Sequence, residues 1–194
     1  MQRKIKIIFF LLLFISGCGL FSTRDVESPV DPRSSFTPPT APEIVLVNLI
    51  SAIVERNLNN YMACFVDSTY STRRFSFTAD VASQIQYPVF RFWSLTYENL
   101  YFTNLRSLTN SNSTSNLFLS NEVVTVTIDT VVYDYDYLLH IEHQKQSVAQ
   151  TVKGKLRFVL GSDSRNLWSI HRWIDFKVND GDTTWSVLKA NFIN

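Results

Sequence analysis

The chain has 194 residues, and its 18 basic and 17 acidic side chains give a formal net charge of +1. A charge so close to zero offers no electrostatic basis for binding nucleic acid. The chain has only five glycines, so a glycine-rich loop that cradles a phosphate is not expected, and its two cysteines permit at most one disulfide.

The N-terminus has the three parts of a secretory signal peptide in order. A basic region comes first, an uninterrupted apolar stretch covers residues 7–15, and two small residues follow. This stretch is about half of the roughly 20 residues that a membrane-spanning helix needs. We therefore predict that residues 1–17 are a leader that is removed. Its basic residues are Arg3, Lys4 and Lys6.

The end of this leader, Ile15-Ser16-Gly17-Cys18, resembles the lipobox of bacterial lipoproteins. In that motif the cysteine thiol receives a diacylglyceryl group, and two or more acyl chains, such as palmitate, hold a protein firmly on a bilayer. The resemblance implies lipid attachment at Cys18 and a membrane-anchored protein of the cell envelope. Gly19 stands where some bacteria place the aspartate that retains lipoproteins at the inner membrane, so we prefer the outer membrane.

A tether is predicted for residues 18–41, which are rich in proline and serine and poor in large apolar residues. The leader removes three of the 18 basic residues and no acidic one, which leaves 15 basic against 17 acidic. The tether therefore has no polybasic patch. The remaining residues, 42–194, have the size of one domain with one core.

The first half of this domain has mostly helical patterns. Pro42 and Glu43 are typical of a helix start, and apolar residues spaced by three and four predict an amphipathic helix over 42–59. We expect a further apolar turn at 61–65, a short strand at 75–77, a short helix at 79–86 and a third helix at 90–108. The face of that third helix is predicted to carry Trp93, Tyr97, Leu100 and Tyr101.

Beyond a polar loop at 109–116 the apolar period changes to two, which is typical of strands. The parity changes near 129–132, where we expect a bulge or a turn. Helices followed by several antiparallel strands predict an α+β domain, with N-terminal helices packed on one face of a strongly curved sheet. The strands are expected at 123–129, 133–141, 148–160 and 167–178, with a hairpin loop at 162–166 and a last helical turn or edge segment at 184–192.

The last two strands resemble the end of nuclear transport factor 2-like domains, also described as cystatin-like or SnoaL-like. The resemblance is carried by Leu156-Arg157-Phe158-Val159-Leu160 and Trp168-Ser169-Ile170-His171-Arg172-Trp173-Ile174-Asp175. The order of elements matches over roughly residues 41–192. The resemblance implies a cone with a pocket at its open end. Some such domains are isomerases or cyclases with a buried acid or histidine, others bind ligands or partners, and many are bacterial lipoproteins of unassigned activity.

The candidate pocket residues are Tyr97, Tyr101, His171, Trp173 and Asp175. A desolvated Asp175 could act as a general base. The interpretation that we favour is a structural one, in which Asp175 caps or hydrogen-bonds the sheet near the following loop. Likewise, we favour the two tryptophans of the motif as core anchors over ligand platforms, and the aromatic face of Tyr133, Tyr135 and Tyr137 as packing against the helices over a pocket wall or contact surface.

No catalytic residue, metal ligand or cofactor site is assigned from the sequence. His140 and His143 fall on opposite parities of one expected strand, so they are poorly placed to share a metal. The chain has no Gly-x-Ser-x-Gly motif. Cys64 stands in the apolar segment Tyr61-Met62-Ala63-Cys64-Phe65, which favours a buried hydrophobic residue over a nucleophile.

Two functional hypotheses remain open at this point. The preferred one is a non-catalytic, membrane-tethered module that binds a small apolar ligand or another envelope protein. The alternative is a small-molecule isomerase or cyclase with Asp175 or His171 as base. A weaker third possibility is a homodimer formed through the outer face of the sheet.

Overall fold

The computed structural model describes residues 35–193, so the predicted leader, Cys18 and most of the predicted tether lie outside the described residues. The described chain contains helices before, between and after the strands. In chain order the elements are α2 (Pro42–Glu55), α3 (Leu58–Ala63), β1 (Ser76–Thr78), α4 (Val81–Gln86), the 3-10 helix η2 (Pro88–Phe92), α5 (Leu95–Ser107), β2 (Ser115–Val126), β3 (Thr130–Ile141), β4 (Thr151–Ser162), β5 (Trp168–Phe176) and α6 (Trp185–Ile193).

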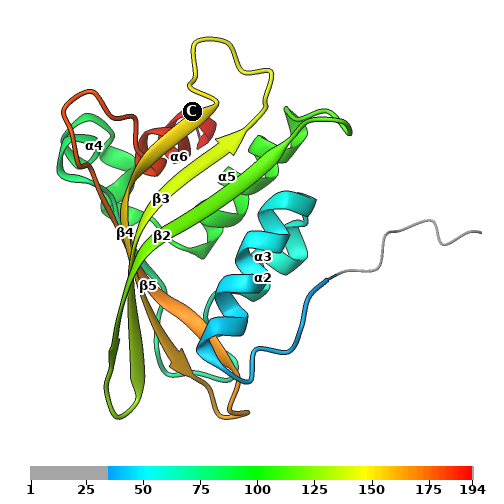
Figure 1. The fold of residues 1–194 in the computed structure, drawn as a ribbon, viewed down its shortest axis with the longest axis vertical. Helices are drawn as coiled ribbons and strands as arrows, with labels where there is room; N and C mark the ends of the chain where they lie inside the picture. Colours follow the sequence, from blue (N-terminus) through cyan, green and yellow to red (C-terminus); the bar gives the residue numbers. More distant parts are fainter. Residues whose placement is uncertain (1–34, 194) are drawn as a thin grey trace, which may run out of the picture. The chain divides into compact units, whose positions relative to one another are not determined.

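The five strands form one sheet in the order β1-β5-β4-β3-β2. The short β1 pairs parallel to β5, and the other neighbours are antiparallel. Buried and solvent-facing residues alternate along β3 and β4, because one face of the sheet is covered by helices. Figure 1 shows the strongly curved sheet with α2, α3 and α5 beside it. The α+β prediction, with helices on one face of a curved sheet, is confirmed.

Residues 35–41, the end of the predicted tether, lie against the domain through backbone hydrogen bonds. The Thr37 amide donates to Asn48 Oδ1 (3.0 Å), and Asn48 Nδ2 donates back to the Thr37 carbonyl (2.7 Å). The Trp168 amide donates to the Pro39 carbonyl (2.7 Å). The segment that precedes α2 is therefore fixed to both α2 and β5.

The helix predicted over 42–59 is in fact two helices. Pro42 begins α2, and Arg56 ends it with a left-handed backbone (φ 53°). The side chain of Asn57 then accepts a hydrogen bond from the Asn60 amide and caps the start of α3. Asparagine is favoured at helix N-caps, so the polar residues that seemed to end one helix also begin the next.

The third predicted helix, 90–108, is also interrupted. A 3-10 turn ends at Phe92, Trp93 and Ser94 are extended, and α5 begins at Leu95. The Trp93 indole nitrogen donates to Glu98 (2.7 Å), which fixes the chain in this bend. The prediction that Trp93, Tyr97, Leu100 and Tyr101 share one helical face is wrong, because Trp93 precedes α5, and Leu100 is exposed whereas Tyr101 is buried.

The β2 strand is longer than predicted and begins inside the segment expected to be a polar loop. Its register shifts between Ser120 and Val123, where Asn121 has a positive φ of 54°. The change of apolar parity near 129–132 corresponds to the turn between β2 and β3, in which the Thr127 amide donates to the Thr130 carbonyl (2.9 Å). The segment 184–192, predicted as a last helical turn or an edge segment, is mostly the helix α6.

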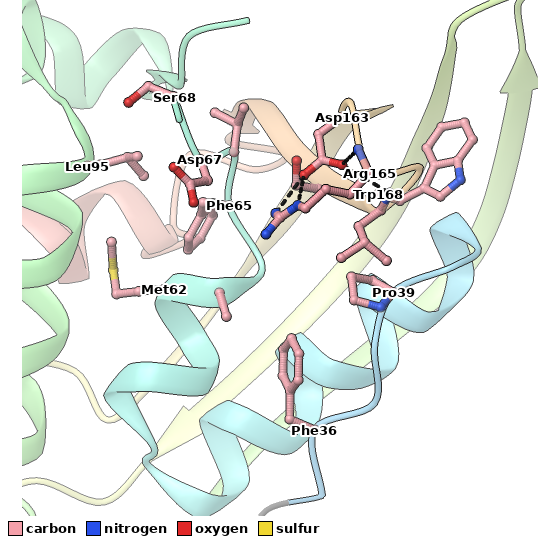
Figure 2. A pocket seen from close by; sticks show the side chains of 14 residues that line it. Phe36, Pro39, Met62, Phe65, Asp67, Ser68, Leu95, Asp163, Arg165 and Trp168 are labelled. Atoms are coloured by element: carbon pink, nitrogen blue, oxygen red, sulfur yellow. Dashed lines mark hydrogen bonds and ion pairs between the residues drawn. The ribbon is translucent and has the colours of Figure 1, made fainter. Parts of the chain in front are cut away.

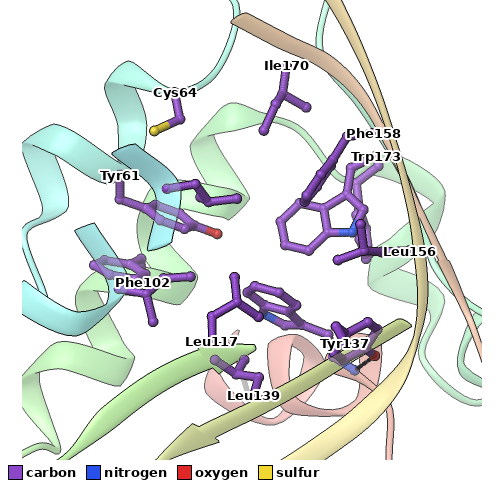
Figure 3. Close-up of a cluster of buried hydrophobic side chains, with 14 of the residues drawn as sticks. Tyr61, Cys64, Phe102, Leu117, Tyr137, Leu139, Leu156, Phe158, Ile170 and Trp173 are labelled. Carbon is purple, nitrogen blue, oxygen red and sulfur yellow. Dashed lines mark hydrogen bonds between the residues drawn. The ribbon is translucent and has the colours of Figure 1, made fainter. Parts of the chain in front are cut away.

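The core lies between the helices and the inner face of the sheet and is rich in aromatic side chains. Tyr61 stacks on Phe102 with ring centroids 4.0 Å apart, and Trp173 packs edge-on against Phe158 (5.1 Å) and Trp185 (4.6 Å). Figure 3 shows Tyr61 and Phe102 of the helices facing Phe158 and Trp173 of the strands. Edge-on and stacked pairs add stability beyond the area they bury.

Cys64 is buried in this core, as the sequence predicts, and burial raises the pKa of its thiol. A thiol held protonated in this way is a poor nucleophile. Among the described residues, no helix combines the length and the apolar character that a bilayer crossing requires.

Candidate functional site

The carboxylate of Asp175 lies between β5 and the start of α6. Its Oδ1 accepts a hydrogen bond from the Tyr137 hydroxyl (2.8 Å), and its Oδ2 accepts from the amide (2.7 Å) and the hydroxyl (2.5 Å) of Ser186. Ser186 is in the first turn of α6, so Asp175 satisfies a helix N-terminus. Burial raises the pKa of Asp175 to about 6, and these hydrogen bonds limit the rise.

A buried ion pair joins α5 to α6. The Lys189 ammonium lies 2.5 Å from both carboxylate oxygens of Glu98, and neither side chain is exposed to solvent. Glu98 also accepts hydrogen bonds from the Tyr61 hydroxyl (2.5 Å) and the Trp93 indole (2.7 Å). The ammonium lies 3.6 Å from the ring centre of Trp173. Burial lowers the pKa of Lys189 to about 8, although Glu98 opposes that shift.

A third buried acid, Asp80, links α4 to the start of α6. Its Oδ2 accepts hydrogen bonds from Ser83 Oγ and Thr184 Oγ1, both at 2.6 Å. Burial raises the pKa of Asp80, but these hydrogen bonds outweigh it and hold the pKa below its ordinary value. All the carboxylate oxygens of Asp80, Glu98 and Asp175 are thus engaged by donors of the chain itself.

An open cavity lies between the end of α3, the β4–β5 hairpin and the segment that precedes α2 (Figure 2). Its volume of about 480 Å³ falls in the range of small-molecule sites. Figure 2 shows Met62 and Phe36 on the side opposite Arg165. The apolar wall residues are Phe36, Pro39, Met62, Ala63, Phe65, Val66, Leu95, Leu167 and Trp168.

The polar part of this cavity contains two acids and one arginine. Arg165 donates to Asp163 Oδ2 through Nε (2.9 Å) and Nη2 (2.6 Å), and its guanidinium lies 3.6 Å from the ring centre of Tyr70. Hydrogen bonds from Thr69, with help from the nearby Arg165 charge, lower the pKa of Asp67. For Asp163, burial is outweighed by the bonds from Arg165, so its pKa is also lowered. Both acids are therefore ionised at neutral pH.

A second, more apolar groove of about 500 Å³ lies between α4 and the end of β5. Val81 and Ile85 of α4 are 75% and 81% exposed beside it. Asp175 also borders the groove, yet only 1% of that residue is exposed. The groove therefore presents apolar side chains rather than the carboxylate.

Comparison with solved structures places this architecture among known folds, although no protein-family model and no curated protein sequence matched the chain. A provisionally named aromatic ring hydroxylase from Novosphingobium aromaticivorans superposes with a TM-score of 0.54 at 15% identity, covering 77% of this chain and 96% of the other. A provisionally named dehydratase of the NTF2-like family from Streptomyces avermitilis gives 0.53 at 10% identity (71% and 93% covered). An NTF2-like superfamily protein from Salmonella enterica serovar Typhimurium gives 0.51 at 15% identity (71% and 89%).

The chain has the nuclear transport factor 2-like (NTF2-like) fold. The fold predicted from the pattern of the last two strands is thereby confirmed. At identities of 15% or less, the neighbours establish the fold of this chain and not its activity.

Within this NTF2-like domain, three of the five predicted pocket residues lie around α6. Trp173 and Asp175 contact Trp185 and Ser186, and the Tyr101 hydroxyl accepts a hydrogen bond from the Trp185 indole (3.0 Å). These residues are buried and contribute to packing and helix capping. None of the five lines the 480 Å³ cavity.

The other two predicted residues lie elsewhere. Tyr97 is half-buried and stacks on Trp93 (5.7 Å between ring centres). His171 is the extra residue of a bulge in β5, where the pairing with β4 shifts by one residue. Burial lowers the pKa of His171, and the charge of the nearby Arg73 lowers it further. His171 and Asp175 are therefore not brought together as a catalytic pair by any contact in the described chain.

Sequence reasoning missed the Glu98–Lys189 pair and the 480 Å³ cavity. One local signal was present, because Lys189 interrupts an otherwise apolar segment at the C-terminus. A buried lysine needs a partner, but the sequence does not say that it lies 91 residues earlier. The cavity is formed by three separate segments, so no single stretch of sequence reveals it.

Proposed function

We propose that the chain is a lipoprotein of the bacterial cell envelope whose NTF2-like domain is a non-catalytic binding module. The sequence Ile15-Ser16-Gly17-Cys18 at the end of a basic and apolar leader supports acylation of Cys18. Residues 18–41 would then connect the lipid to the domain. The outer membrane is the preferred location. The ligand would be a small molecule with apolar surface, or another envelope protein.

One observation favours binding over catalysis. The interior, where isomerases of this fold would need a free acid, is packed with aromatic side chains, and Asp175 has both oxygens engaged. A general base must reach the proton that it removes, within hydrogen-bond distance or through one water. The acids of the open cavity have lowered pKa values, which makes them weak bases at neutral pH. The cavity therefore suits binding better than proton transfer.

The anchor is tested by metabolic labelling with a fatty-acid analogue, followed by membrane fractionation. Cys18→Ser should abolish labelling and leave an unprocessed precursor or a released protein. Cys64→Ser is the matched control, because it also removes a thiol but lies in the domain core. Equal labelling and retention of the Cys18→Ser protein would contradict the anchor.

The alternative function is an isomerase- or cyclase-type enzyme with Asp175 as base. The raised pKa of Asp175 favours it, since a base near neutral pKa is suited to proton abstraction. Such an enzyme must open its interior. In a Trp168→Phe protein the remaining tryptophans are all buried, so their fluorescence should resist quenching by acrylamide. Strong quenching of the folded protein would favour the enzyme.

Self-association through the outer face of the sheet is a further part of the proposal. Phe118 of β2 and Leu138 of β3 are directly paired across the strands and are 59% and 40% exposed. Exposed apolar pairs of this kind are common at protein contacts. A dimer in analytical ultracentrifugation that Phe118→Glu dissociates is the expected result, and a monomer at all concentrations would exclude this arrangement.

A further inference from the structure

The charge of the 480 Å³ cavity restricts the class of ligand that it can bind. Among its apolar walls lie more acidic than basic side chains. Asp163 and Arg165 neutralise each other through two hydrogen bonds, at 2.9 and 2.6 Å. The Asp163 carboxylate has little capacity left to accept hydrogen bonds from a ligand, because its Oδ1 also accepts from the amides of Arg165 and Leu167. Asp67 remains, and it is ionised because its pKa is lowered. Two acids against one arginine give the cavity a net charge of −1.

Arg165 already has an anionic partner within the chain. Its guanidinium is held between the carboxylate of Asp163 and the ring of Tyr70, whose centre is 3.6 Å away. An anionic ligand there would be repelled by Asp163, whose Oδ2 accepts from both Nε and Nη2 of Arg165. By contrast, the hydrogen bonds to the Asp67 carboxylate come from a neutral residue: the Thr69 amide donates to Oδ1 (2.8 Å), and the Thr69 side chain also bonds the carboxylate. Asp67 is exposed, and a carboxylate has about four acceptor positions, so it can also accept from a ligand.

Aromatic rings complete the arrangement. Phe36 and Trp168 come from two different segments, are partly exposed, and are among the residues that line the cavity. The face of an aromatic ring attracts a cation, and aromatic walls with one acid are a general solution for holding an ammonium group. The apolar remainder of such a ligand would contact side chains such as Met62 and Leu95.

From this geometry we infer that the cavity binds a small organic cation, an amine or quaternary ammonium group attached to an apolar body. The inference deepens the proposed binding function and rests on it. Asp67 pairs with the cationic group, and the partly exposed wall residues, such as Phe36 and Met62, contact the apolar body. The cavity volume of about 480 Å³ suits a ligand of drug-like size.

The segment that precedes α2 contributes to this site. Phe36 and Pro39 line the cavity, and the Trp168 amide donates to the Pro39 carbonyl (2.7 Å). One wall therefore belongs to the part of the chain that leads toward Cys18. A ligand in the cavity would stabilise the attachment of this segment to β5, because it contacts both.

The test uses benzyltrimethylammonium as the probe and neopentylbenzene, its uncharged isostere, as the matched ligand. Binding to the full chain in a nonionic detergent is followed by tryptophan fluorescence. Trp168 is the reporter, because it lines the cavity and the other three tryptophans of the chain are buried. The inference predicts that the cation binds more tightly than the isostere at low salt, and that the preference shrinks in 1 M salt.

Two variants and one control locate the site. Asp67→Asn should weaken cation binding by about two- to fivefold, the range expected for one exposed charge pair, and should leave binding of the isostere unchanged. Ala63→Phe should fill the cavity and weaken both ligands. Asp180→Asn is the control, since Asp180 is an exposed acid that does not line this cavity.

The outcomes separate the inference from the proposed function. Equal affinity for the cation and the isostere, with both weakened by Ala63→Phe, would overturn the choice of a cation but keep the cavity as a binding site. No binding of either probe at millimolar concentration would overturn the inference outright. In that case the lipoprotein proposal is still tested separately, by the labelling of Cys18.

Discussion

The Glu98–Lys189 pair allows a stringent test of how the NTF2-like domain is held together. The perturbation is Lys189→Met, which keeps an unbranched side chain of similar size and removes the charge. It leaves the Glu98 carboxylate buried, with hydrogen bonds from Tyr61 and Trp93 but with no counter-charge. A buried carboxylate without a counter-charge is strongly disfavoured, so the folded state should lose stability.

The magnitude follows from the burial of both partners, which are fully inaccessible to solvent. Removing one partner of such a pair costs about 3–5 kcal/mol. The contact of the ammonium with the Trp173 ring, at 3.6 Å, is lost as well and lies within that range. For a domain of this size the melting temperature should fall by roughly 6–20 °C.

The assay is a double-mutant cycle by urea denaturation followed by circular dichroism. Glu98→Gln alone should also be strongly destabilising, because it leaves Lys189 unpaired among aromatic rings. The double variant should recover most of the loss, since a glutamine can still bond with Tyr61 and Trp93 and no charge remains buried. A loss below about 1 kcal/mol for Lys189→Met, or simple additivity of the two single changes, would refute this account of the pair.

Two further predictions concern Asp175 and Gly154. The folded pKa of Asp175, about 6, lies above the ordinary value of 3.8, so the folded state binds the proton more tightly and stability falls as pH rises from about 4 to 6. The fall should be about 3 kcal/mol in wild type and should be absent in Asp175→Asn, measured by denaturation at several pH values. A wild-type profile that runs parallel to the variant would contradict the raised pKa. Gly154→Ala should cost about 1–3 kcal/mol, because its Cβ would lie 2.5 Å from the Phe176 carbonyl oxygen. Gly181→Ala, where a Cβ meets nothing within 4 Å, should melt like wild type, and equal melting of both variants would disprove the close approach.

The sheet could be predicted from the sequence because its signal is local and repeated. Tyr133, Tyr135 and Tyr137 alternate with acids along β3, and the structure places all three on the buried face. The strand pair with two tryptophans was sufficient to suggest the NTF2-like fold. Where the alternation was clear, the predicted strand lies within a few residues of the observed one.

The helix breaks could not be predicted from periodicity, because apolar spacing continues through them. Arg56 leaves the helical conformation and Asn57 caps the next helix, so the break depends on two backbone angles and one side-chain bond. The bend at Trp93 depends on a hydrogen bond to Glu98. Each of these is a tertiary or capping effect that outweighs the local pattern.

The candidate site was predicted only in part. Asp175 was named from the sequence as a candidate pocket acid, and the structure buries it and places it at the start of α6, a helix that the sequence left undecided. The open cavity depends on Asp67, Arg165 and Phe36, which come from three loops or termini. The packing of the β4–β5 hairpin and of the segment before α2 brings these residues together. Residue spacing does not predict either packing arrangement.

The most direct test of the central claim, a lipid-anchored envelope protein, is mass spectrometry of the N-terminal peptide of the chain purified from native membranes. The account predicts a mature chain that begins at Cys18 and carries the mass of a diacylglyceryl group, with or without a further acyl chain. A mature chain that begins at another residue, or a Cys18 without added mass, would contradict it.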